Sequence, residues 1–460
     1  MNHHSIFLKA YHCPDGRTIH YSAARLHEDP SATTGTSILD IDIHNDANHG
    51  DNDIKNCPCW VFFYPAGPNR RLLDAIVSRY ASHFQCLKDV IFLCVTRPGK
   101  GGTSSSGLAK LSSSKNGNSK DADNENCNTR EKLHVATACR DVVAILDHYQ
   151  ISKTSLMYMC AGSTFAYSFA AMFPERTTGN IIGISSWILR YDPTTSTSSS
   201  SSSDSIPTQP QMYTLTHKMA MKGFFGPKWM VSSLAGGIVN SATGLLSMLP
   251  KDFAEGRFQK CLSDREKSEW EKQFPKTDEE KSGFIDVMNW IHTDGESGVG
   301  SVFVNVPASP SEDEKGDYEA VGCNIHIHCN GSGGTPAENT ERNDGDAMDI
   351  AVCLSTQQEL GMVYNTSVPP QQNVLLWHGE NDTMISAEGS EWLAKVIPGG
   401  ASLTKVPGGT HQGTMFFFPE DVMEALNRLS ENGGVEEVAV DDDDGEHCYD
   451  NDNGPVGQTV

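Results

Sequence analysis

The chain has 460 residues, of which 38% are hydrophobic and 20% are charged. This length exceeds one ordinary hydrophobic core and predicts either a large domain with insertions or two domains. The 59 acidic and 35 basic residues give a formal net charge of −24. Such a balance argues against nucleic acid or an anionic lipid surface as partner, because an acidic protein repels phosphate groups.

The thirteen cysteines do not form the pattern of a disulfide framework, because their number is odd and they are scattered along a long chain. Some lie within apolar runs, where a free thiol behaves as a small hydrophobic side chain, namely Cys94, Cys139 and Cys353. The N-terminal residues also lack the apolar core of a secretory signal. We therefore expect reduced cysteines and a cytoplasmic location.

Residues 229–250 carry no charge and are long enough to span a bilayer. However, the stretch contains several serines, an asparagine, a threonine and three glycines. This polarity suits a pair of packed helices better than a lipid-exposed span. We expect no stable membrane insertion.

Short apolar runs alternate with helical patterns along most of the chain. In chain order, strands are expected at residues 19–21, 60–64, 90–95, 155–159, 181–185, 373–377 and 402–406. Helices are expected at residues 72–84, 133–148, 164–173, 388–396 and 419–429. The alternation predicts an α/β fold with a mostly parallel central sheet flanked by helices.

Polar segments interrupt this alternation. They bury too little apolar surface to offset their ordering entropy, so we expect disordered loops at residues 41–58, 103–131, 194–210 and 307–346. Residues 212–290 contain spaced Phe and Trp residues and predict a mostly helical cap over one end of the sheet. The expected organisation is a core formed by residues 1–192 and 349–433, a cap with low-complexity insertions at 193–348, and an acidic disordered tail at 434–460.

A candidate nucleophile follows the fourth of these strands. Cys160 stands where the strand turns sharply into a helix, with Gly162 two positions later to let that helix pack closely. A helix N-terminus and a nearby imidazolium both favour the thiolate, which is the reactive form of cysteine. Ser163 is the rival nucleophile, but it lies one turn into the helix. An inert buried thiol at position 160 is the other interpretation.

A candidate acid and base follow the last two strands. Asp382 ends the turn after residues 373–377, and His411 follows two glycines after residues 402–406. A histidine on such a loop can reach the nucleophile while the carboxylate fixes its tautomer. Glu380 is the alternative acid, and His378 is expected to order the turn through hydrogen bonds.

These segments resemble those of the α/β-hydrolase fold superfamily. Residues 95–103, VTRPGKGGT, are similar to the Asp-Arg-Pro-Gly-x-Gly-x-Ser segment of that superfamily, residues 64–70, YPAGPNR, to its oxyanion loop, and residues 377–382, WHGEND, to its acid turn. The order nucleophile, acid, base also agrees. Cysteine replaces the usual serine, as in dienelactone hydrolases. Two further departures are Tyr158, where glycine is usual, and Pro65 in the oxyanion loop, which has no N–H to donate.

The resemblance implies a hydrolase acting on a carboxylic ester, thioester or lactone through a triad of Cys160, His411 and Asp382. It further implies oxyanion donors at Ala161 and at Ala66 or Gly67. The Phe-, Trp- and Met-rich cap predicts a small to medium, largely apolar acyl substrate, and no cofactor is expected.

Two alternatives stay open. A catalytically inactive ligand-binding or scaffold protein would use the same fold, since fold does not fix function. An acyltransferase would use the same nucleophile with an acceptor other than water. Cys323-Asn-Ile-His-Ile-His-Cys329 contains metal-ligating residue types, but its spacing matches no common zinc pattern, so we expect no metal.

Overall fold

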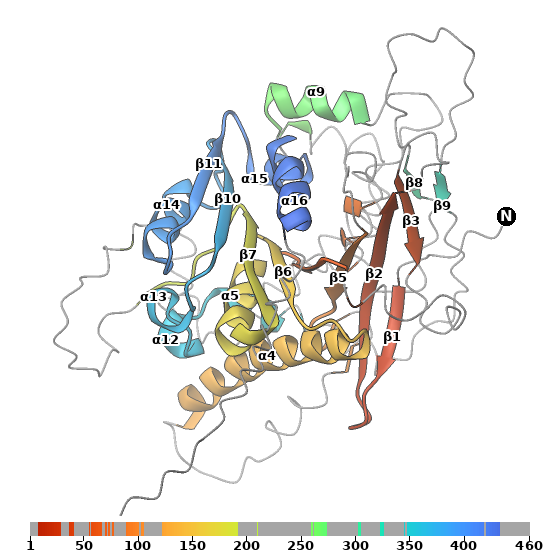
Figure 1. Ribbon diagram of the computed structural model, residues 1–460. Coiled ribbons are helices and arrows are strands. Elements are labelled where there is room, and N and C mark those ends of the chain that lie inside the picture. The colour runs from red at the N-terminus through yellow and green to blue at the C-terminus, as the bar shows by residue number, and fades with distance from the viewer. Residues whose placement is uncertain are drawn as a thin grey trace, which may run out of the picture.

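A computed structural model describes the parts of the chain that form the sheet and its helices (Figure 1). The described residues are 8–28, 36–40, 89–100, 122–191, 262–273, 347–417 and 420–432, with shorter pieces at 55, 57–66, 70, 72–73, 76–77, 103–104, 209, 259–260, 302–304, 323–325 and 345.

Nine strands form the central sheet. They are β1 (Leu8–His12), β2 (Thr18–Glu28), β3 (Thr36–Asp40), β4 (Cys59–Phe63), β5 (Val90–Val95), β6 (Thr154–Met159), β7 (Thr177–Ile184), β10 (Asn373–Gly379) and β11 (Ser402–Val406). Their order across the sheet is β1-β2-β5-β4-β6-β7-β10-β11. Strand β5 pairs with one edge of β2, and β1 and β3 pair with successive parts of its other edge. Because β1 and β3 share one position beside β2, the nine strands fill eight positions across the sheet.

The sheet is mostly parallel. Strands β5, β4, β6, β7, β10 and β11 all run in one direction, and β2 runs antiparallel to each of its neighbours. Every residue of β4, β5 and β6 is buried, as expected for central parallel strands covered on both faces. The parallel direction brings the carboxyl ends of β6, β10 and β11 to one edge of the sheet, where the loops after them meet.

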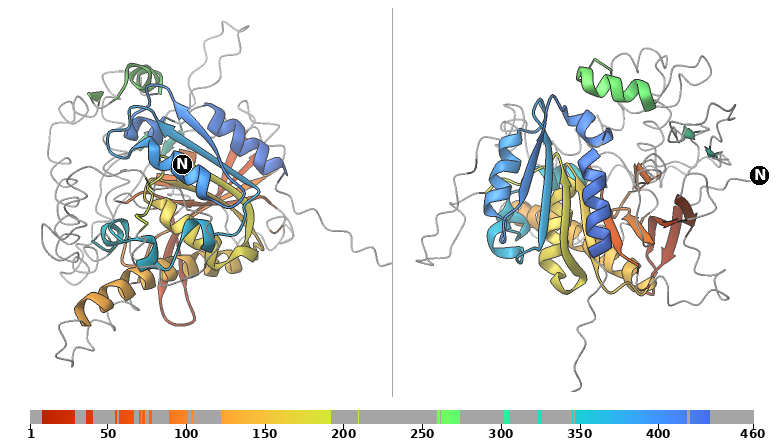
Figure 2. Two further views of the ribbon diagram at one scale, coloured as in Figure 1. Left: turned by 90° about the vertical axis from the view of Figure 1, so that its left-hand side faces the viewer. Right: turned by 45° about the horizontal axis from the view of Figure 1, so that its top comes forward.

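Helices cover both faces of the sheet (Figure 2). On one face lie α4 (Ala122–His148), α5 (Gly162–Met172) and α14 (Ala387–Val396), and on the other lies α16 (Glu420–Asn432). Two indole N–H groups fix α16 to the sheet: Trp60 donates to Ser430 Oγ at 2.9 Å, and Trp377 donates to Asp421 Oδ2 at 2.9 Å.

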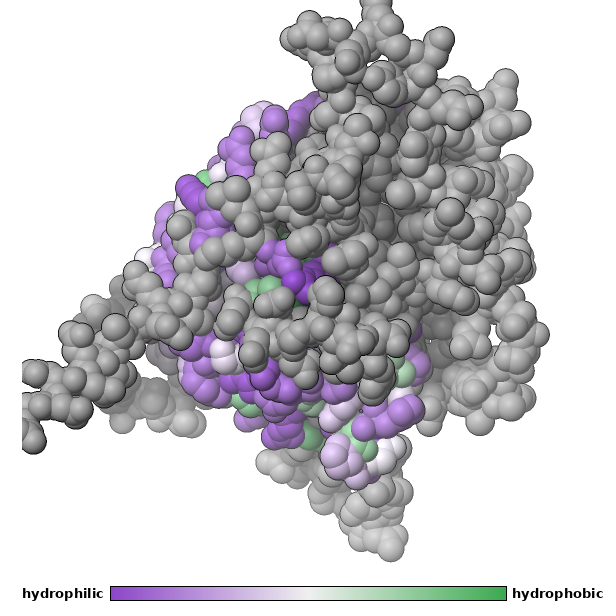
Figure 3. All heavy atoms as spheres, turned by 45° about the vertical axis from the view of Figure 1, so that its right-hand side comes forward, coloured by the Kyte–Doolittle hydropathy of each residue, from purple (hydrophilic) through white to green (hydrophobic). Residues whose placement is uncertain are grey.

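The remaining described elements are short. They are the 3-10 helix η2 (Pro174–Arg176), the helices α9 (Asp264–Gln273), α12 (Gln357–Leu360), α13 (Tyr364–Ser367) and α15 (His411–Phe416), and a separate pair of strands, β8 (Val302–Val304) with β9 (Cys323–Ile325). On the face drawn in Figure 3, the surface of the described residues is mainly hydrophilic.

The predicted fold class is confirmed: the structure is α/β, with a mostly parallel sheet flanked by helices. One detail of the prediction was wrong, and some elements were not predicted. The helix expected from residue 133 begins at Ala122, within a segment expected to be a loop. Its first residues are polar, and a helix end that extends beyond the sheet needs no apolar stripe. The strands β1 and β3 and the helix α15 were also not predicted.

Several predictions concern residues that lie outside the described ones. These include most of the expected cap and loops, the acidic tail, residues 229–250 and the side chains of the Cys323–Cys329 segment. Within the described part of the chain, no helix has the length and apolar character needed to cross a membrane. The division into core, cap and tail and the cytoplasmic location stay predictions.

Candidate active site

Cys160 occupies a strained corner between β6 and α5. Its backbone has φ of +47°, a left-handed conformation that costs a residue with a side chain about 1–3 kcal/mol. Neighbouring segments fix this conformation: the Cys160 N–H donates to Ile184 O at 2.9 Å, and the Cys160 carbonyl accepts from the Trp187 N–H at 3.1 Å. The thiol is half-buried, and the corner lifts it above the carboxyl edge of the sheet.

Gly162 allows the helix after this corner to lie close to β4. A Cβ atom at position 162 would overlap the carbonyl group of Phe63 at the end of that strand. No residue with a side chain fits there without moving the strand or the helix. The structure therefore gives Gly162 the role expected for a small residue two positions after the nucleophile.

His411 lies between Asp382 and Cys160. Its Nδ1 donates to Asp382 Oδ2 at 2.7 Å, so Nε2 is the ring nitrogen that remains for the Cys160 thiol, which interacts electrostatically with the ring. Burial disfavours the imidazolium, but the hydrogen bond with Asp382 and the interaction with Cys160 outweigh it and raise the pKa of His411 to about 10. Asp382 therefore both orients the ring and stabilises its protonated form.

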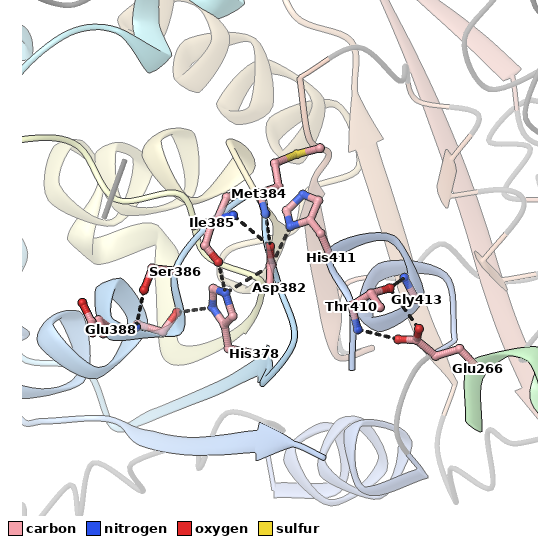
Figure 4. A network of polar contacts seen from close by, with 11 residues as sticks. Glu266, His378, Asp382, Met384, Ile385, Ser386, Glu388, Thr410, His411 and Gly413 are labelled. Atoms are coloured by element: carbon pink, nitrogen blue, oxygen red, sulfur yellow. Dashed lines mark hydrogen bonds and ion pairs between the residues drawn. The ribbon is translucent and has the colours of Figure 1, made fainter. Parts of the chain in front are cut away.

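Asp382 is held by four hydrogen-bond donors (Figure 4). Its Oδ1 accepts from the backbone N–H groups of Met384 at 2.9 Å and Ile385 at 2.8 Å, and its Oδ2 faces both His411 and His378. Burial opposes the charge, yet the contacts with His378, His411 and the Ile385 N–H hold the pKa of Asp382 well below its usual range. The carboxylate stays ionised and fixed in orientation.

His378 orders the turn that carries Asp382. The ring is fully buried, with Nδ1 2.7 Å from Ser390 Oγ and Nε2 3.0 Å from the Ile385 carbonyl and 3.2 Å from Asp382 Oδ2. Because a carbonyl oxygen only accepts, Nε2 must carry the proton. His378 therefore supports Asp382 from behind, as the sequence predicted.

Apolar side chains surround the Cys160 thiol. Ala161, Trp187 and Ile385 form a small buried cluster, against which Ala66, Cys353 and Cys160 itself pack. Of the expected oxyanion donors, Ala161 lies at the N-terminus of α5 and Ala66 lies half-buried after β4, both in this cluster. Gly67 lies outside the described residues.

The rival residues lie elsewhere. Ser163 is fully buried and its hydroxyl donates to the Trp187 carbonyl, so this side chain is already engaged. Glu380 is exposed, whereas Asp382 bonds His411. The geometry brings together Cys160, His411 and Asp382 and leaves both alternatives out of the cluster.

Tyr158 fits its position because the neighbouring strand has a glycine opposite. Tyr158 of β6 pairs with Gly183 of β7, and a Cβ atom at position 183 would overlap the Tyr158 ring. The Tyr158 hydroxyl lies 2.8 Å from Ser186 Oγ and 3.1 Å from the Tyr167 hydroxyl, which satisfies it in the core. The space usually left by glycine at position 158 is thus provided by Gly183.

We expect Gly183→Ala to destabilise the fold by about 1–3 kcal/mol, because the added methyl group overlaps a ring that has no free space to enter. Thermal unfolding would measure the loss. Once Tyr158 is replaced by alanine, the overlap is gone. The Gly183→Ala substitution should therefore cost less stability in the Tyr158→Ala variant than in the wild type. Additive losses in the two variants would contradict the pairing.

A buried charge cluster holds the segment after β4, and the sequence did not predict it. Arg97 donates to Asp349 at 2.5 Å and to the Tyr64 carbonyl, and its guanidinium lies over the Tyr64 ring, 4.2 Å from its centroid. Lys100 and His134 also contact Asp349, at 3.3 and 3.2 Å. These bonds fix the start of the segment that leads to Ala66, so Arg97 has a structural role.

Neither a protein-family model nor a curated protein matches the chain. Among solved structures, the chain is similar to a hydrolase from Pseudomonas aeruginosa PA01, with 12% identity over 93% of this chain and 98% of that chain and a TM-score of 0.44. A carboxylesterase from Nitrososphaera gargenis is 11% identical over 92% and 98% of the two chains, with a TM-score of 0.42. An enol-lactonase from Burkholderia xenovorans LB400 is 9% identical over 92% and 99%, also with a TM-score of 0.42.

The strand order with its antiparallel β2, the strained corner after β6, and the contact between Asp382 and His411 after the last two parallel strands together define the α/β-hydrolase fold. The chain has this fold. The residue at the corner of this chain is a cysteine, Cys160.

Proposed function

We propose that the chain is a hydrolase of carboxylic esters, thioesters or lactones in which Cys160 is the nucleophile, His411 the acid and base, and Asp382 the residue that orients His411. The observation that supports this most is the His411 ring, which bonds Asp382 through Nδ1 and interacts electrostatically with Cys160 at the strained corner after β6. Such a chain of contacts is what nucleophilic catalysis by a thiol requires.

Acylation begins when His411 takes the proton from the Cys160 thiol, so that a thiolate forms beside an imidazolium. The sulfur attacks the carbonyl carbon, and the N–H groups of Ala161 and of Ala66 or Gly67 hold the oxyanion that forms. The C–O or C–S bond to the leaving group then breaks, and the His411 Nε2–H protonates that group. The product of this half-reaction is a thioester on Cys160.

Deacylation regenerates the enzyme with water. Neutral His411 takes a proton from a water molecule, the resulting hydroxide attacks the thioester carbonyl, and the C–S bond breaks. The carboxylic acid leaves, and the sulfur returns as thiolate beside protonated His411. Throughout, the two backbone N–H groups and His378 hold Asp382, so the imidazole keeps the tautomer that points Nε2 at the reacting atoms.

The surroundings of Cys160 favour an apolar acyl group. The described side chains next to the thiol are Ala161, Trp187 and Ile385. Met384, beside Asp382, is 44% exposed, which is unusual for a large apolar side chain. Such a lining contributes by burying apolar substrate surface, at roughly 25 cal/mol per Å².

The test is a screen of acyl esters, thioesters and lactones, with the intact protein mass measured after each substrate. Hydrolysis with a transient mass increase of one acyl group on Cys160 supports the proposal. An acyl-enzyme that persists until an alcohol or amine acceptor is added would identify an acyltransferase instead. Binding of these compounds with neither acylation nor turnover would identify the inactive ligand-binding protein.

Cys160 should react with iodoacetamide at neutral pH before the other twelve cysteines, because its half-buried thiol lies at the strained corner beside a candidate base. Among the described cysteines, Cys59, Cys94 and Cys139 are buried and should react only on unfolding. Peptide mapping after partial labelling would give the order of reaction. Equal labelling of all cysteines, or none at Cys160 in the folded protein, would favour an inert thiol.

A further inference from the structure

Glu266 of helix α9 brings a buried carboxylate to the segment that carries His411. Its exposed fraction is 3%, although it lies in the long insertion between the two halves of the sheet, 144 positions before Thr410. Thr410 donates to it twice, from its N–H to Oε1 at 2.7 Å and from its hydroxyl to Oε2 at 2.9 Å. Figure 4 shows the Glu266 side chain pointing at Thr410, directly before His411.

Thr410 determines where α15, and therefore His411, begins. It is the N-cap residue of α15, and its Oγ accepts from the Gly413 N–H at 3.0 Å. Since that hydroxyl donates its own proton to Glu266, the carboxylate selects the rotamer in which Thr410 caps the helix. His411 is the next residue, so the orientation of its backbone follows from these bonds.

The carboxylate and α15 fit closely. A Cβ atom at position 413 would overlap the Glu266 carboxyl group, so Gly413 is the residue type that permits this approach. Helix α9 also contacts the other end of α15, where the Trp270 ring lies 6.2 Å from the ring of Phe417, the C-cap residue. Both ends of the short helix that begins with His411 are therefore in contact with α9.

Capping of α9 itself explains only part of this arrangement. Glu266 and Ser263 form the reciprocal contacts of a capping box, with the Ser263 N–H donating to Glu266 Oε2 at 2.8 Å and the Glu266 N–H donating to Ser263 Oγ at 3.4 Å. A capping box is usually exposed and needs one acceptor atom. The two bonds from Thr410 and the burial of the carboxylate exceed that requirement.

We propose that Glu266 is a positioning residue for His411, through which the insertion between the two halves of the sheet contributes to the active site. The inference rests on the proposed function, because it assigns His411 a catalytic position to be held. Glu266 touches neither His411 nor Cys160 in any described contact, so its effect passes through Thr410 and the start of α15. Helix α9 is then required for full turnover.

The test compares Glu266→Gln, Glu266→Ala and Ser263→Ala. Gln keeps one acceptor oxygen for the Thr410 N–H but cannot accept from the hydroxyl with its amide nitrogen, so kcat should fall about tenfold. Ala removes all acceptors and should lower kcat on the order of 10²-fold, as expected when a catalytic group shifts by about an ångström. In both variants KM should change less than about twofold, because the substrate contacts remain.

Two measurements separate positioning from stability. An NMR titration of the His411 ring should move from a pKa of about 10 toward the ordinary value of about 6.5 in Glu266→Ala, because the bonds to Asp382 and Cys160 loosen. Ser263→Ala removes the cap of α9 and leaves the Thr410 contacts in place, so it should lower the melting temperature and keep kcat and the titration unchanged.

Some outcomes would overturn the proposal. If both Glu266 variants lose melting temperature but keep kcat and the His411 titration, Glu266 is structural only. If Ser263→Ala reproduces the Glu266→Ala loss in kcat, capping of α9 explains the effect. If the wild-type protein turns over no acyl substrate, the proposed function fails by itself, and the His411 titration in the three variants still decides whether Glu266 positions the ring.

Discussion

Replacing Cys160 with alanine is expected to lower kcat on the order of 10⁶-fold, because a triad that lacks its nucleophile retains only the oxyanion donors and substrate binding. The fold should remain, since alanine keeps the Cβ atom, and with it the same backbone strain at φ of +47°, and fills no new space. Steady-state hydrolysis of the best substrate from the screen, together with the melting temperature, would measure both effects.

Two controls complete this experiment. Cys160→Ser retains a nucleophilic atom and should lose much of the activity, because a hydroxyl beside an imidazolium does not ionise as a thiol does. Cys13→Ala removes a thiol at the far end of the sheet, in the turn between β1 and β2, and should leave kcat unchanged. If Cys160→Ala is as active as the wild type, Cys160 is not the nucleophile, even though the protein has the α/β-hydrolase fold.

The sequence indicated that the three candidate site residues lie near one another, because each follows a strand in the chain. Cys160, Asp382 and His411 lie directly beyond β6, β10 and β11, and parallel strands bring their carboxyl ends to one edge. A local pattern, an apolar run followed by a turn, therefore indicates a shared location for residues that are far apart in sequence. The same reasoning predicted the fold class.

Contacts between distant segments were not predictable in this way. Tyr158 looked incompatible with its corner, because the compensating Gly183 lies on another strand, and only the register between β6 and β7 pairs them. Glu266 lies in a polar, lysine- and glutamate-rich helix whose pattern indicates a solvent-exposed surface. The helix α15 was missed because six residues are too few to show a periodic apolar face.

Asp382→Asn is expected to lower kcat about 10⁴-fold while the protein stays folded, because an amide would orient His411 wrongly. The two backbone N–H groups of Met384 and Ile385 require an acceptor, so the Asn carbonyl oxygen takes the place of Oδ1. The amide NH₂ then faces His411 Nδ1. That nitrogen must become the acceptor, and the proton moves to Nε2, where it blocks the ring from acting as base toward water.

The double variant Asp382→Asn/His411→Ala tests whether these residues act as one unit. His411→Ala alone removes the acid and base, and Asp382 then has no imidazole to orient, so the double variant should be no slower than His411→Ala. The His411 titration should also fall below a pKa of about 10 in Asp382→Asn, because the carboxylate that stabilises the imidazolium is gone. Losses that multiply in the double variant would place Asp382 in a separate role. No change in any variant would leave the fold without the proposed reaction, and ligand binding would become its function.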